Sequence, residues 1–97
     1  MNKPIGEVVA KNIKVNNEVK EWIEGEMSKW AQTHPEEADG DGLYYLVNFR
    51  RLRDAAKNAV QVGCDLQILA KKHIFKCENR GLNPKRALRH CLAALHT

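Results

Sequence analysis

The chain has 97 residues, 43% of them hydrophobic and 29% charged, with a net charge of +4 and a pI near 9.1. This composition excludes a largely disordered chain and predicts a single soluble globular domain over residues 1–97. No apolar run is long enough to cross a bilayer, and the first ten residues lack the pattern of a signal peptide, so we expect a cytoplasmic protein.

The charge changes sign near the middle of the chain. Residues 1–48 hold 5 lysines and 9 acidic residues, whereas residues 49–97 hold 11 basic and 3 acidic residues. An acidic first half of net charge −4 therefore precedes a basic second half of net charge +8. A positive field concentrates polyanions, so a nucleic-acid contact is expected on the second half alone.

The spacing of apolar residues predicts an all-α fold. Asn16 or Asn17 can cap the first helix, and Asn83 followed by Pro84 is a strong start for the last one. The prediction is a compact bundle of about four helices, over residues 17–32, 43–62, 65–79 and 83–96. Residues 5–15 are ambiguous, because Val8 suits a helix while residues 13–15 alternate like a strand, and we favour a short helix there.

Basic residues gather on the polar faces of these predicted helices. Merged cationic faces could follow nucleic-acid phosphates, although lysine and arginine are also common on any solvated helix face. The leading hypothesis is a small nucleic-acid-binding protein, and the predicted binding residues are Arg50, Arg53, Lys57, Lys71, Lys72, Lys85, Arg86 and Arg89.

A second hypothesis is a protein-binding regulator or inhibitor of a nucleic-acid-handling complex. Ile68 and Phe75 point away from the main apolar stripe of the predicted third helix, so they are either an exposed contact pair or part of a core. The acidic half offers another surface for a protein partner, made of Glu21, Glu24, Glu36, Glu37, Asp39 and Asp41. A homodimer is a further possibility.

The sequence gives little support for a catalytic or metal-binding site. His73 and Cys77 have the spacing of two zinc ligands, which Cys64 and Cys91 could complete, but thiols packed in a core explain these residues better. The three cysteines cannot all pair within one chain, so we expect free thiols and a reducing compartment. We therefore expect a protein that is not an enzyme and has no cofactor or metal.

Overall fold

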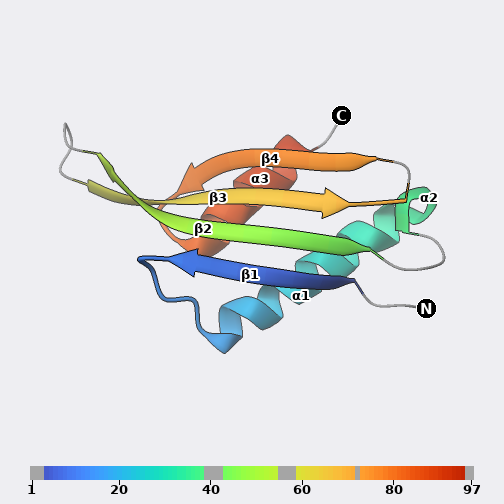
Figure 1. The fold of residues 1–97 in the computed structure, drawn as a ribbon, viewed down its shortest axis with the longest axis horizontal. Helices are drawn as coiled ribbons and strands as arrows, with labels where there is room; N and C mark the ends of the chain where they lie inside the picture. The colour runs from blue at the N-terminus through green and yellow to red at the C-terminus, as the bar shows by residue number, and fades with distance from the viewer. Residues whose placement is uncertain (1–3, 39–42, 55–58, 72, 96–97) are drawn as a thin grey trace.

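The structure, a computed structural model, describes residues 4–38, 43–54, 59–71 and 73–95. Within these ranges the chain forms a four-stranded mixed sheet and two main helices (Figure 1), so the predicted all-α helical bundle is wrong. In chain order the elements are β1 (Ile5–Lys11), α1 (Asn17–Thr33), the short α2 (Pro35–Ala38), β2 (Tyr44–Asp54), β3 (Ala59–Leu69), β4 (Ile74–Gly81) and α3 (Pro84–Ala94).

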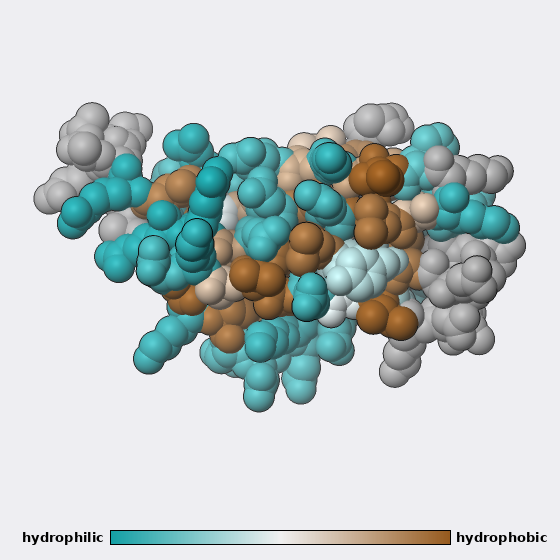
Figure 2. Space-filling view, viewed as in Figure 1, coloured by the Kyte–Doolittle hydropathy of each residue, from teal (hydrophilic) through white to brown (hydrophobic). Residues whose placement is uncertain are grey.

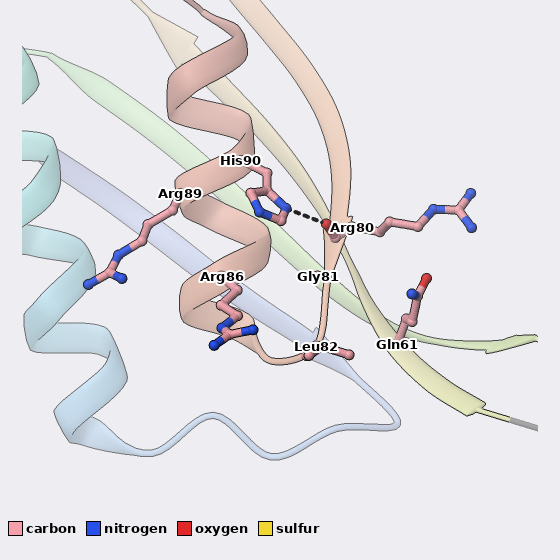
Figure 3. Close-up of a pocket in the computed structure, with 7 residues that line it drawn as sticks. All are labelled: Gln61, Arg80, Gly81, Leu82, Arg86, Arg89 and His90. Atoms are coloured by element: carbon pink, nitrogen blue, oxygen red, sulfur yellow. Dashed lines mark hydrogen bonds between the residues drawn. The ribbon is translucent and has the colours of Figure 1, made fainter.

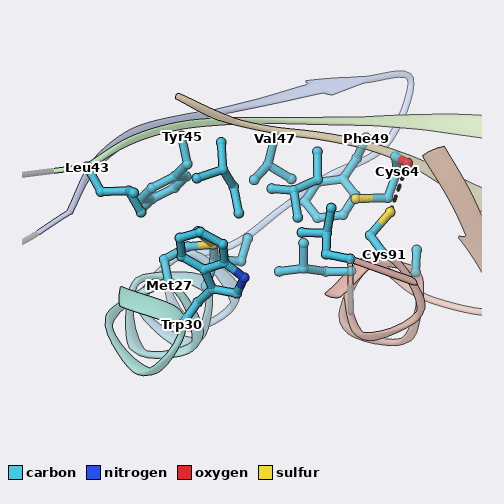
Figure 4. Close-up of a cluster of buried hydrophobic side chains, with 14 of the residues drawn as sticks. Met27, Trp30, Leu43, Tyr45, Val47, Phe49, Cys64 and Cys91 are labelled. Atoms are coloured by element: carbon cyan, nitrogen blue, oxygen red, sulfur yellow. Dashed lines mark hydrogen bonds between the residues drawn. The ribbon is translucent and has the colours of Figure 1, made fainter. Parts of the chain in front are cut away.

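The strands lie in the order β1-β2-β3-β4, with β1 parallel to β2 and the remaining pairs antiparallel. Parallel neighbours need a crossover connection, and α1 supplies it. Both main helices lie behind the sheet in Figure 1, and the side chains between the two layers form the core in Figure 4. The sheet therefore has one face covered by helices and one open face.

The two predicted terminal helices are confirmed, because local capping signals specify them. The Asn16 side chain accepts a hydrogen bond of 2.9 Å from the backbone N–H of Val19 and so caps α1. The Asn83 side chain caps α3 in the same way at the N–H of Arg86, also at 2.9 Å, and Pro84 occupies the first helical turn.

The helices predicted over 43–62 and 65–79 are wrong, since these segments form β2, β3 and β4. Val62, Cys64, Leu66 and Ile68 are buried, and the residues between them face the other side of the sheet. This is the two-residue period of a strand, not the 3.6-residue period of a helix. Likewise, residues 5–11 form a strand in place of the short helix.

The core joins both main helices to the sheet. Met27 and Trp30 of α1 pack beneath β2, and Cys91 of α3 packs beneath β3, where its thiol donates a hydrogen bond of 3.3 Å to the Cys64 carbonyl (Figure 4). All three cysteines are free. Within the described ranges, no helix combines the length and the apolar character needed to cross a membrane.

Candidate nucleic-acid interface

A row of basic residues crosses one end of the open face. Strand register aligns Lys11 of β1 with Arg50 of β2, Arg50 with Gly63 of β3, and Gly63 with Arg80 of β4. The three basic side chains are exposed. We call this region, together with the neighbouring start of α3, the basic end of the molecule.

The start of α3 extends the basic end around the edge of the sheet. A pocket of about 500 Å³ lies where β4 turns into α3, and Figure 3 shows the seven residues that line it. Arg86 extends from the first turn of α3 and Arg89 extends toward α1, whereas Arg80 and Gln61 lie on the other side of β4. The guanidinium groups therefore point in different directions, an arrangement suited to an extended anion and not to a single small one.

His90 holds the two basic elements together. Its Nδ1 lies 2.7 Å from the main-chain carbonyl oxygen of Arg80, as the dashed line in Figure 3 shows. A carbonyl can only accept, so Nδ1 carries the proton and donates it. The side chain of Asn79 donates to the His90 carbonyl at 3.5 Å. These contacts position Arg80 relative to Arg86 and Arg89.

A protruding two-stranded ribbon adds further cations to the basic end. Pairing of β2 with β3 continues to Asp54 and Ala59, whereas β1 pairs only as far as Arg50 and β4 only as far as Val62. The ribbon carries Arg51 and Arg53, both exposed. Beside it, the turn after β1 contributes Lys14, with Asn12 in the left-handed region at φ 60°.

The basic side chains differ in how far they are already engaged. Arg50 forms an ion pair of 2.7 Å with Glu78 on the open face. Lys85 lies 3.9 Å from Glu18, and both Lys85 and Arg89 lie within 6 Å of the Trp22 ring, at 5.8 and 5.5 Å. Arg80 and Arg86 form no ion pair with any described residue. These two are therefore available to an anionic partner.

The predicted binding residues do not all come together. Lys85, Arg86 and Arg89 share α3, with Arg50 and Arg53 at the same end of the sheet. Lys71 lies in the β3–β4 connection at the opposite end, where its N–H bonds the Glu37 carbonyl at 3.0 Å. Lys57 and Lys72 fall outside the described residues.

Of the two alternatives for Ile68 and Phe75, an exposed contact pair or part of a core, the structure has the second. Ile68 and Phe75 are register partners on β3 and β4, and both belong to the core under the sheet. Ile68 is fully buried, and the Phe75 ring meets the Trp30 ring edge-on at 5.2 Å. A protein partner has no access to Ile68.

The six acidic residues predicted to bind a protein partner do not form one exposed group among the described residues. Glu21, Glu24 and Glu36 are exposed on α1 and α2. Glu37 is buried, with its carboxylate 2.5 Å from Nδ1 of His73. Asp39 and Asp41 lie outside the described residues.

Sequence reasoning missed four residues of the basic end: Lys11, Lys14, Arg51 and Arg80. Helical wheels place residues of one helix on a common face, whereas Arg80 and Lys11 meet Arg50 only through strand pairing. The apolar–polar alternation of residues 60–68 was the signal for this sheet. Among the described residues, no group of three His, Cys, Asp or Glu side chains could hold a metal ion.

Comparison with known proteins places this arrangement in a known fold. The structure superimposes on the N-terminal domain of Protein Y from Thermus thermophilus with a TM-score of 0.68, over 91% of this chain and 85% of that one. The two share one fold. Their sequences are 12% identical, so the likeness to Protein Y is one of architecture. No protein-family model matches the sequence, and no curated protein does.

Proposed function

We propose that this protein is a non-enzymatic, cytoplasmic RNA-binding protein that associates with the ribosome through its basic end. The observation that carries the proposal is that Arg80 of β4 and Arg86 of α3 line one pocket beside the basic row of the open face, and that neither forms an ion pair with a described residue. Each phosphate that such a surface neutralises releases counterions, and this release drives binding.

The directions of the arginine side chains favour a nucleic-acid backbone over a small anion. Arg80 lies on one side of β4 and Arg86 on the other (Figure 3), so together they can contact separate phosphates of one backbone. Folded RNA presents its phosphates as an extended, curved surface that proteins recognise largely by shape. The ribbon with Arg51 and Arg53 adds two cations at the same end of the molecule.

The resemblance to Protein Y supports a choice among polyanions. Protein Y is a ribosome-associated protein, and its N-terminal domain has this fold. RNA folded within the ribosome is therefore the partner we propose. Binding alone accounts for the basic end, so the proposal assigns the protein no chemical step.

Co-sedimentation with purified ribosomes at increasing salt concentrations tests the proposal. We expect wild-type protein to sediment with ribosomes at low salt and to be released as salt rises. Arg80→Glu and Arg86→Glu should each weaken binding at least about tenfold and flatten the salt dependence. Lys20→Glu is the matched control, because it makes the same change of charge on exposed α1.

Wild-type protein that stays in the supernatant at low salt would overturn ribosome association. If Lys20→Glu weakens binding as much as Arg86→Glu does, net charge and not the basic end would be responsible.

A further inference from the structure

The open face carries an apolar row at the end opposite the basic row. Register aligns Ile5 with Tyr44, Tyr44 with Leu69, and Leu69 with Ile74, so one side chain from each strand contributes. Their exposed fractions are 67%, 38%, 40% and 63%. Figure 2 shows the open face, where hydrophobic side chains gather toward the right and hydrophilic ones dominate the left. We call these four residues the apolar row.

An apolar cluster that spans all four strands differs from scattered exposed hydrophobic residues. Large contiguous apolar patches on soluble proteins generally mark a surface that binds another molecule. The helices that cover the other face of the sheet leave this row without a partner within the described chain. A second layer packed on the open face would remove the apolar row from water.

The charges next to the apolar row indicate what the second layer is. In the next register row, Glu7 lies on β1 and Lys76 on β4, with Leu46 and Gln67 between them. An acid thus stands at one edge of the sheet and a base at the other. This pattern is complementary to itself when the sheet is turned over about an axis parallel to its strands.

We propose that the open face binds a second copy of this chain, sheet against sheet, about a two-fold axis that runs along the strands between β2 and β3. This rotation places β1 of one copy over β4 of the other. Ile5 then faces Ile74, Tyr44 faces Leu69, and Glu7 faces Lys76. Each of these contacts occurs twice, as a two-fold interface requires.

The same rotation accounts for where the interface ends. Lys11 of one copy would lie over Arg80 of the other, and these like charges repel. The contact is therefore concentrated on the apolar row and the Glu7–Lys76 pairs. The two basic ends remain open on the same side of the dimer.

Sedimentation equilibrium of the full chain tests the dimer. We expect a reversible monomer–dimer equilibrium for wild-type protein and at least a tenfold lower association constant for Ile74→Asp. Leu82→Asp is the matched control, because Leu82 is 65% exposed in the loop after β4 and lies outside the apolar row. It should dimerise like wild type.

Charge exchange tests the orientation of the two copies. Glu7→Lys alone and Lys76→Glu alone each create two like-charge contacts and should weaken the dimer, whereas the double variant should restore it. A circular dichroism spectrum of each variant reports whether it is folded.

A wild-type protein that stays monomeric up to about 1 mM overturns the proposal. A double variant no tighter than the single variants overturns the orientation on which it rests. The outcome is separate from ribosome binding, because Arg86→Glu should lose ribosomes and keep the dimer.

Discussion

At the scale of single residues, two thiols are held in their neutral form. Hydrogen bonding to Cys64, together with burial, raises the pKa of the Cys91 thiol. Burial raises the pKa of the Cys77 thiol to about 11. Because the thiolate is the reactive species, both side chains belong to the packing of α3 against the sheet and not to a nucleophilic site.

This packing predicts a loss of stability in alkaline solution. The pKa of Cys77 is higher in the folded protein than the value near 9 of an unfolded chain, so folding favours the neutral thiol. The stabilisation is complete below pH 9 and is lost as the pH rises toward 11. Urea denaturation at several pH values should show a steeper alkaline loss for wild type than for Cys77→Ala, and equal slopes would contradict the assignment.

A second residue-scale prediction concerns the apolar row. The negative charge of Glu7 raises the pKa of Tyr44, whose hydroxyl lies 3.4 Å from the Glu7 carboxylate. Burial raises the pKa of the other tyrosine, Tyr45. Glu7→Gln should therefore lower the pKa of one tyrosine and leave the other unchanged in an ultraviolet absorption titration. Identical titrations of variant and wild type would show that Glu7 does not act on Tyr44.

At the scale of elements, the position of α3 depends on its close approach to β4. A Cβ atom added to Gly81 would lie 2.7 Å from the backbone nitrogen of Ala87, which is too close for both to keep their places. The end of β4 and the first turn of α3 are thus in backbone contact. This contact sets Arg80 beside Arg86.

Two Gly→Ala changes should therefore have opposite effects on the free energy of unfolding. Gly81→Ala forces β4 and α3 apart and should cost about 1–3 kcal/mol. Gly25→Ala lies in α1, where the added methyl group meets nothing within 4 Å apart from its chain neighbours and the backbone of its own helix, so it should stabilise the protein by up to about 1 kcal/mol. Urea denaturation measures both, and a destabilised Gly25→Ala variant would contradict the argument.

At the scale of the whole molecule, the open face of the sheet has a basic end and an apolar end. The basic row and the start of α3 lie at one end, and the apolar row lies at the other. Three acidic residues of the first half, Glu18, Glu21 and Glu24, are exposed on α1, outside both rows. The basic end nevertheless draws on both halves of the sequence, because Lys11 and Lys14 of the first half join the arginines of the second.

Position and not net charge should decide RNA binding. Lys71 and Arg80 lie at opposite ends of the molecule, although Lys71→Glu and Arg80→Glu change the net charge equally. Only Arg80→Glu should reduce the affinity for a folded ribosomal RNA fragment by about tenfold or more. Fluorescence anisotropy at fixed salt measures the difference, and equal losses would contradict a localised interface.

By itself, the sequence determined the features that depend on neighbouring residues. Asn16, Asn83 and Pro84 act within one helical turn, so α1 and α3 were predictable from their caps. The sequence likewise placed three basic residues on one helix, α3: Lys85, Arg86 and Arg89. The polar–apolar alternation of β3 was also present in the sequence, but apolar residues at Tyr44, Leu46 and Leu52 on the open face hid the same period in β2.

Only the tertiary structure decided what the strands bring together. Lys11 and Arg80 are distant in sequence, and two further strands separate them, so their common row exists only through three strand pairings. The apolar row depends on the same three registers. A shift of one residue in any strand would turn its side chains to the opposite face, because side chains alternate across a sheet. Register is set by the packing of the whole core, which no local stretch of sequence contains.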